Sequence, residues 1–159
     1  EITGVWPALW MMPEKSVYGN WPRSGEIDIV ETINEKSDEL VTTIHYGHDY
    51  HRQISKTTFL NQLTKLSNPI DHNKISLIWE DEYFEWLLND QLVFKVNFNE
   101  VENLTPNPFL EEFYLLINVA VGGNWPGPPN STMYCNSRKS CPDVKKLIVD
   151  YIAYYEKIN

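Results

Sequence analysis

Three acidic side chains on one short segment have the types and spacing to do chemistry together. Glu26, Asp28 and Glu31 belong to the run EIDIVE, whose alternating isoleucines indicate a β-strand. Alternate residues of a strand share a face, so Glu26 and Asp28 point one way and the isoleucines point into the core. Strict alternation would bury Glu31 on the core face, where a charge is costly. A β-bulge near Ile29-Val30 returns Glu31 to the face of the other two acids, and bulges are frequent beside active sites.

Carboxylates that share one face repel each other, which raises the pKa of at least one and keeps it protonated near neutral pH. One ionised carboxylate and one protonated carboxyl are what glycoside hydrolysis needs. With one bulge, the Cα atoms of Glu26 and Glu31 should lie about 13 Å apart at about 3.3 Å per residue. Inclined side chains can bring the carboxyls to the roughly 5–5.5 Å of a retaining pair. An acidic edge strand that faces solvent is the alternative interpretation of this spacing.

Composition limits what the chain can bind. Its 159 residues suit one domain with a real core, and 42% hydrophobic residues argue against disorder. The net charge of -9 and the pI of about 4.8 argue against a nucleic-acid partner. They fit an uncharged substrate or simply an acidic protein. The six Trp and nine Tyr fit either an aromatic β core or a sugar-binding cleft.

The cysteines and the chain ends give weaker information. Cys135 and Cys141 are either a small-loop disulfide of a secreted protein or two free thiols, and no zinc-binding pattern accompanies them. Two sequons, at Asn103 and Asn130, support secretion only weakly. The sequence shows no transmembrane run or signal peptide and opens on EITGVW, so we expect an internal piece of a longer precursor.

Short apolar runs between Pro- and Asn-containing turns predict an all-β antiparallel sandwich or jelly roll. The turn Asn89-Asp90 predicts a tight hairpin, and residues 97–103 have room for one short helical turn. The predicted strands are Val5–Met12, Glu26–Thr32, Val41–Tyr46, Lys74–Trp79, Tyr83–Leu88, Gln91–Val96, Glu112–Val121 and Leu147–Glu156.

Four segments together resemble glycoside hydrolase family 16. Trp6–Pro13 (WPALWMMP) and Tyr18–Glu31 (YGNWPRSGEIDIVE) resemble the family signature, Ile117–Gly127 (INVAVGGNWPG) resembles its second hallmark, and Leu147–Tyr155 (LIVDYIAYY) resembles its last strand. The similarity spans essentially the whole chain in the family's order. It implies one catalytic domain over residues 1–159, a concanavalin A-like jelly roll whose concave cleft binds the substrate.

The spacing Glu-x-Asp-x-x-Glu resembles the laminarinase-type branch, whereas the lichenase and xyloglucan transglycosylase branch lacks the bulge residue. The resemblance therefore implies endo-hydrolysis of β-1,3-glucan with retention of configuration. Carried over by position, Glu26 would be the nucleophile, Glu31 the general acid/base, and Asp28 a residue that tunes their protonation. His45 matches the family's histidine on the neighbouring strand and would hydrogen-bond to the carboxylates. Without that match, His45 would be an ordinary polar strand residue.

Five further residues are predicted to bind the substrate. Trp21 and Trp125 match the aromatic residues of the cleft and lie beside Pro or Gly in loops, where Trp is often exposed. Asn118 would point into the cleft, and Arg23 would contact sugar hydroxyls or the nucleophile. Trp10 would line either the cleft or the core.

The chain departs from the family pattern at its start, where several strands that complete both sheets are absent. The resemblance also implies a structural Ca²⁺ at Asp150, although the upstream oxygen ligands are missing, and the chemistry itself requires no cofactor. Exposed sheet edges would favour self-association if nothing supplies the missing strands.

The leading hypothesis is a secreted, extracellular retaining endo-β-1,3-glucanase whose partner is a β-glucan polysaccharide, with neither nucleic acid nor membrane as partner. One alternative is a non-catalytic or truncated β-glucan-binding module. Another is a hydrolase of a different β-linked polysaccharide, such as agar or carrageenan.

Overall fold

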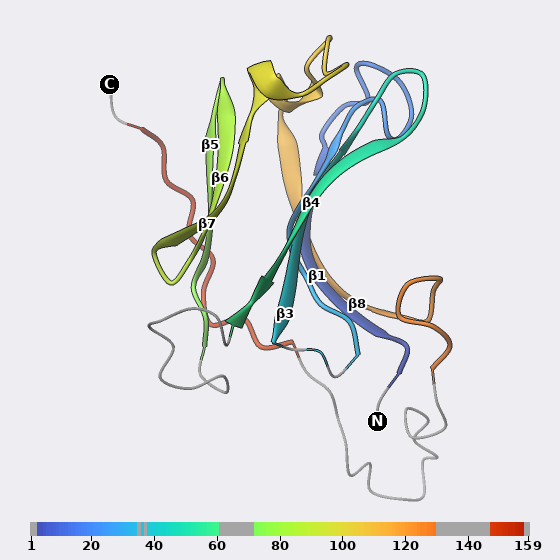
Figure 1. The fold of residues 1–159 in the computed structure, drawn as a ribbon, viewed down its shortest axis with the longest axis vertical. Helices are drawn as coiled ribbons and strands as arrows, with labels where there is room; N and C mark the ends of the chain where they lie inside the picture. Colours follow the sequence, from blue (N-terminus) through green and yellow to red (C-terminus); the bar gives the residue numbers. More distant parts are fainter. Residues whose placement is uncertain (1–2, 35, 37, 61–71, 130–146, 158–159) are drawn as a thin grey trace, which may run out of the picture.

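The computed structural model describes residues 3–34, 36, 38–60, 72–129 and 147–157, which form two antiparallel β-sheets (Figure 1). The larger sheet has the spatial order β4-β3-β2-β1-β8, and the smaller sheet has the order β5-β6-β7. The strands of the larger sheet are β1 (Val5–Pro13), β2 (Glu26–Glu31), β3 (Glu39–Tyr46), β4 (Arg52–Phe59) and β8 (Phe113–Val121). Those of the smaller sheet are β5 (Ile75–Glu80), β6 (Tyr83–Leu88) and β7 (Gln91–Asn97). Two 3-10 turns, η2 (Phe98–Glu100) and η3 (Pro108–Leu110), lie between β7 and β8.

The hydrophobic core lies between the two sheets. Ile27 and Ile44 come from the larger sheet, Phe84 and Trp86 from the smaller one, and Phe109 from η3; all five are fully buried. Each large apolar side chain removed from water in this way contributes about 1.5–3 kcal/mol. Because alternate residues occupy this core layer, the remaining residues of β2 and β3 are directed to the opposite face of the larger sheet.

The hairpin between β6 and β7 has the predicted turn. Asn89 and Asp90 both adopt positive φ angles, 50° and 64°, as a two-residue type I′ turn requires. Short polar side chains tolerate this left-handed region better than most residues do. The burial of β6 alternates strictly, which is typical of a strand with one face against a core.

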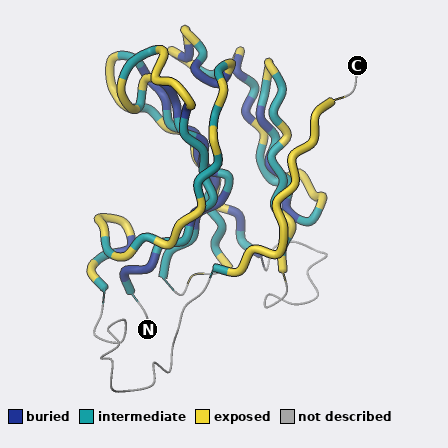
Figure 2. Tube along the Cα trace, turned by 180° about the vertical axis from the view of Figure 1, so that it is seen from behind, coloured by how far each residue is buried: buried dark blue, intermediate teal, exposed yellow. Residues whose placement is uncertain are grey.

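Two strand predictions failed. The residues of β4 were not predicted as a strand, because the segment RQISKTTF contains few apolar residues. Leu147–Glu156 was predicted as a strand, and this was wrong, since residues 147–157 form none. Instead they run as an exposed extended segment (Figure 2). A strand needs a partner for its backbone groups, and this segment pairs with no strand in the described part of the chain.

The all-β antiparallel class is confirmed, whereas some other predictions fall outside the described residues. Cys135, Cys141 and the Asn130 sequon lie in the segment 130–146, so their predictions remain untested. No helix among the described residues has the length and apolar character needed to span a bilayer.

Candidate active site

The predicted bulge is present on β2. Between Asp28 and Glu31 the strand advances three residues, while its partner β3 advances only two, from Thr43 to Val41. The pairing with β1 likewise skips Ile29. The extra residue shifts the parity of the strand, so Glu31 lies on the same sheet face as Asp28, away from the core.

The three carboxylates differ in burial. Asp28 is 3% exposed and Glu31 is 8% exposed, whereas Glu26 is half-buried at the start of the strand. Gly25 precedes Glu26 with a φ of 82°, and a Cβ there would lie 3.0 Å from the ring of Phe109. Glycine therefore allows the chain to enter β2 close against the core.

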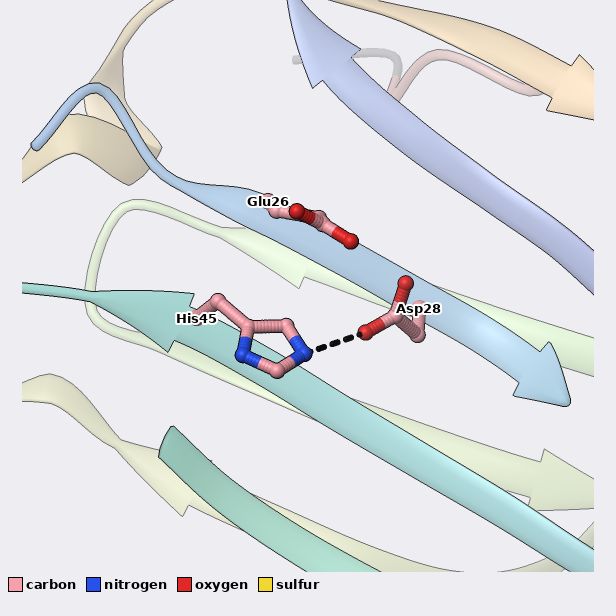
Figure 3. Close-up of side chains that lie close together, drawn as sticks. All are labelled: Glu26, Asp28 and His45. Atoms are coloured by element: carbon pink, nitrogen blue, oxygen red, sulfur yellow. Dashed lines mark ion pairs between the residues drawn. The ribbon is translucent and has the colours of Figure 1, made fainter. Parts of the chain in front are cut away.

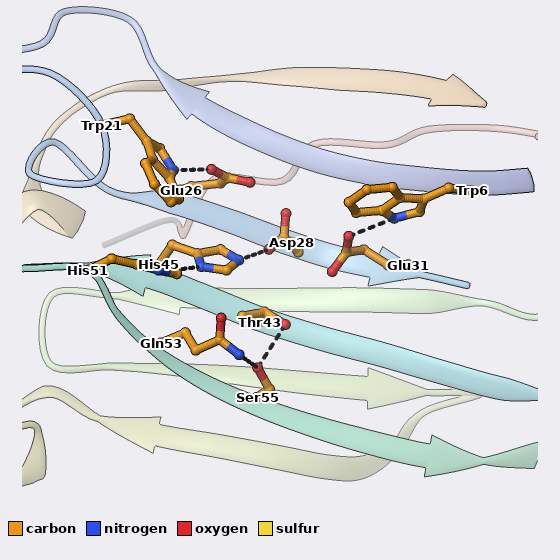
Figure 4. A network of polar contacts seen from close by, with 10 residues as sticks. All are labelled: Trp6, Trp21, Glu26, Asp28, Glu31, Thr43, His45, His51, Gln53 and Ser55. Atoms are coloured by element: carbon orange, nitrogen blue, oxygen red, sulfur yellow. Dashed lines mark hydrogen bonds and ion pairs between the residues drawn. The ribbon is translucent and has the colours of Figure 1, made fainter. Parts of the chain in front are cut away.

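Each carboxylate has its own polar partner (Figure 4). The indole Nε1 of Trp21 donates a hydrogen bond to Oε2 of Glu26. The indole Nε1 of Trp6, on β1, donates to Oε1 of Glu31 over 2.9 Å. Asp28, between them, has its Oδ2 3.0 Å from Nε2 of His45 (Figure 3). The predicted carboxylates and the predicted histidine are thus brought together on one face.

Burial raises the pKa values of all three acids, and the charge of Asp28 adds to the rise at both glutamates. Burial raises the pKa of Asp28 to about 7. Burial and then the charge of Asp28 raise the pKa of Glu31 to about 7, against the opposing effect of the Trp6 hydrogen bond. The pKa of Glu26 is raised by the same two causes, but His45 and the Trp21 hydrogen bond oppose the rise. The site can therefore hold protonated and ionised carboxyls together near neutral pH.

His45 contacts Asp28 as a neutral ring. Its contact has the geometry of an ion pair, but burial lowers the pKa of His45. A neutral imidazole that donates from Nε2 satisfies both observations. Ligand atoms of Glu26, Asp28 and His45 lie within 4.8 Å of one another, close enough to surround a cation. In this structure Asp28 and His45 contact each other, and Glu26 accepts from Trp21.

The predicted substrate residues differ in their surroundings. Trp21 and Trp125 are 48% and 42% exposed, and Trp125 packs edge-on against Trp6 with ring centroids 5.2 Å apart. Trp10 pairs with Asp28 across β1 and β2, so it lies on the carboxylate face, where its Nε1 donates to Oδ1 of Asn118.

Two predicted residues lie apart from the carboxylate cluster. Arg23 donates from Nε to the carbonyl oxygen of His48, which braces two loops, and its role as a substrate contact stays a prediction. Asp150 is exposed, and among the described residues it belongs to no group of three or more His, Cys, Asp or Glu side chains close enough to bind a metal. The predicted calcium ion at Asp150 stays a prediction.

Two residues of this face were not predicted. Trp6 shares the face of Trp10 by parity, which was visible in the sequence, but its hydrogen bond to Glu31 was not. His51 contacts His45, with Nε2 2.7 Å from Nδ1, and its ring lies 4.7 Å from that of Trp21. Because β4 was not predicted, nothing placed His51 opposite β3.

Comparisons with known proteins agree with this geometry. A family model described as "XgeA-like, catalytic GH16 domain" matches residues 1–77, which include the whole of β2. The glucan endo-1,3-beta-glucosidase A1 of Niallia circulans is 35% identical over 172 residues, covering 97% of this chain and 22% of the relative. The glucan endo-1,3-beta-glucosidase of Cryptopygus antarcticus is 36% identical over 128 residues, covering 77% of this chain and 47% of the relative.

Among solved structures, the laminarinase catalytic domain from Thermotoga maritima superposes with a TM-score of 0.70 at 30% identity. The match covers 84% of this chain and 53% of that domain, and it confirms the jelly-roll class. This chain thus spans about half of that domain and less than half of the two curated relatives. On its fold, its bulged carboxylate strand and these relatives, the chain belongs to the laminarinase-like members of glycoside hydrolase family 16.

Proposed function

We propose that this chain carries the catalytic face of a retaining endo-β-1,3-glucanase. The observation that supports this best is the bulged strand β2, which presents Glu26, Asp28 and Glu31 on one sheet face with raised pKa values. An acidic strand facing solvent would leave all three acids exposed, yet Asp28 and Glu31 are buried. Buried carboxyls that neighbour each other are typical of acid–base sites.

In the first step, ionised Glu26 attacks the anomeric carbon while protonated Glu31 donates its proton to the departing glycosidic oxygen. This gives a covalent glycosyl ester on Glu26. In the second step, Glu31, now ionised, removes a proton from water, whose oxygen attacks the same carbon and releases Glu26. The two displacements restore the original anomeric configuration. Asp28, hydrogen-bonded to His45, tunes the protonation of its neighbours.

The substrate class follows from the aromatic residues around the carboxylates. Trp21 is half-exposed next to Glu26, and Trp125 is half-exposed next to the Trp6 indole that binds Glu31. Exposed indole faces can stack on the apolar faces of sugar rings at both ends of β2. The curated relatives are glucan endo-1,3-beta-glucosidases, so we propose β-1,3-glucan as the substrate.

The decisive experiment incubates the protein with laminarin and measures new reducing ends, with the anomer first formed identified by NMR. We expect β-anomeric products from the parent. Glu26→Gln should lower the rate by at least about 10³-fold, because the amide cannot act as nucleophile. The matched control is Glu82→Gln, an exposed glutamate in the turn between β5 and β6, which should keep the parent rate.

Two outcomes would redirect the proposal. Binding of laminarin without new reducing ends would identify a β-glucan-binding module. Hydrolysis of agar or carrageenan in preference to laminarin, in a substrate panel, would keep the machinery but replace the substrate. Parent-level activity in Glu26→Gln, with the circular dichroism spectrum retained, would contradict the assignment of the nucleophile.

A further inference from the structure

His51 connects the two groups that flank Glu26. It lies in the connection 47–51 between β3 and β4. The centroid of its ring lies 5.0 Å from that of His45 and, with the rings tilted by 44°, 4.7 Å from that of Trp21. Trp21 in turn donates to Glu26, and His45 contacts Asp28. One exposed ring thus touches both residues that hold the Glu26 end of the site (Figure 4).

The backbone of the connection fixes where His51 lies. Gly47 has a φ of 121°, and a Cβ there would lie 2.2 Å from the carbonyl oxygen of Tyr50. Only glycine allows this close approach of the two sides of the loop. Arg52, the next residue along, stacks its guanidinium 3.7 Å above the ring of Tyr50. His51 is therefore held between a constrained loop and the first residue of β4.

The hydrogen atoms on the two imidazoles follow from their partners. An ionised Asp28 can only accept at Oδ2, so in that state its contact with His45 requires a hydrogen on Nε2. In the neutral ring, Nδ1 of His45 must then be an acceptor. The 2.7 Å contact with Nε2 of His51 is a hydrogen bond only if His51 donates it. His51 thus donates to His45, and His45 donates to Asp28.

Burial lowers the pKa values of both imidazoles, which favours the neutral rings that this series of hydrogen bonds needs. From β2, Glu26 and Glu31 oppose the lowering of the His45 pKa, but burial outweighs them and keeps the ring neutral. The pKa of His51 is also lowered, by burial and then by His45. If both rings were charged, an N–H of each would face the other, which would break the hydrogen bond between them.

We propose that His51 is a positioning residue, whose Nε2–H holds His45 in the tautomer that donates to Asp28 and whose ring supports Trp21 at Glu26. A histidine that lacks such a partner can exchange its ring hydrogen between the two nitrogens. The positioning role of His51 adds to the proposed function, and only its effect on kcat rests on that function.

The test uses two variants that separate the donor from the ring. His51→Gln keeps an N–H that can reach Nδ1 of His45, whereas His51→Phe keeps a ring against Trp21 but cannot donate. The tautomer of His45 is read from its imidazole ¹⁵N chemical shifts, with the four histidines assigned by single substitutions. We expect the Nε2–H tautomer in the parent and in His51→Gln, and a mixture of tautomers in His51→Phe.

The kinetic arm measures kcat and KM on laminarin. His51→Phe should lower kcat by about 10- to 100-fold with little change in KM, because misplaced groups near the reacting atoms have effects of this size. His51→Gln should restore most of the loss, which a merely structural role would not predict. His72→Phe, at an exposed histidine before β5, is the matched control and should change neither quantity.

The NMR measurement and the kinetic measurement test the role of His51 and the proposed function separately. An Nδ1–H tautomer of His45 in the parent, or an unchanged tautomer and kcat in His51→Phe, would overturn the role of His51. If His51→Phe does not fold, a tautomer mixture in His51→Gln would overturn it equally. A parent without hydrolytic activity would contradict the proposed function, whereas the NMR measurement would still decide the role of His51.

Discussion

Glu26 and Glu31 lie at opposite ends of β2, and each accepts a hydrogen bond from a different indole. At the first end, Trp21 comes from a loop, is half-exposed, and shares its neighbourhood with His45. At the second end, Trp6 comes from the adjacent strand β1 and is covered by Trp125. The Glu26 end of β2 is therefore open to solvent, with several hydrogen-bond donors nearby, whereas the Glu31 end is enclosed.

This difference separates the protonation states of the two glutamates. Glu31 is 8% exposed, and its pKa rises to about 7, so a large fraction carries a proton at neutral pH. His45 and an indole hydrogen bond oppose the rise at both glutamates, but the rise at Glu26 is the smaller one, which favours its ionised form. This difference supports the proposed roles of Glu31 as acid and Glu26 as nucleophile, because identical side chains can differ in protonation when their surroundings differ.

The sharpest test of this comparison changes the leaving group. Glu31→Gln should lower laminarin hydrolysis by about 10²–10⁴-fold, because general acid catalysis of the departing oxygen is lost. On an aryl β-glucoside oligomer with a nitrophenolate leaving group, glycosylation needs no proton, so a burst of nitrophenolate should persist. Glu26→Gln should lose activity on both substrates. Equal losses for Glu31→Gln on both substrates would contradict its role as the acid.

A smaller effect should separate the two indoles by pH. Trp21→Phe removes a donor that lowers the pKa of Glu26, so the acid limb of the kcat/KM profile should move up by about half to one pH unit. Trp6→Phe removes the donor that lowers the pKa of Glu31, so the basic limb should move up by a similar amount. Each variant is the control for the other. A shift of the acid limb in Trp6→Phe would mean that the proton had been assigned to the wrong carboxyl.

The sequence predicted the carboxylate face well because a physical conflict constrained it. Glu31 could not be buried as an ion among the residues that alternate with Glu26 and Asp28, so the bulge followed from parity and desolvation. The structure places that bulge at Ile29. The core residues of β6 were equally readable, since the burial of that strand alternates strictly. On β2, Ile27 is buried as predicted, whereas Ile29 lies at the bulge and is only partly buried.

What the sequence did not predict depends on partners distant in the chain. β4 has a weak apolar pattern and exists because β3 offers it a ladder of backbone hydrogen bonds. His51 was missed with it, although its contact with His45 spans only six residues. In the opposite direction, Leu147–Glu156 has the apolar residues of a strand but pairs with no described strand. An apolar pattern shows the capacity to form a strand, whereas pairing decides the outcome.

The smallest predicted effect concerns the dependence of stability on pH. Asp28 and Glu31 have folded pKa values of about 7, above the 3.8 and 4.5 of the unfolded chain. Raised carboxyl pKa values mean that the folded state binds more protons, so their stabilisation is lost as pH rises toward and through 7. The lowered pKa values of His45 and His51 act oppositely up to about one pH unit above the unfolded value of 6.5, which offsets part of this loss.

The free energy of unfolding should therefore fall by about 1 kcal/mol between pH 6.5 and pH 8, measured by urea titration. Glu31→Gln removes one of the two strongly shifted groups, so the fall should shrink by about half, whereas Glu82→Gln should leave it unchanged. Stability that instead rises over this interval would mean that the carboxyls are ionised in the folded protein at pH 6.5. The enclosed end of β2 would then be no better suited than the open end to hold the catalytic proton.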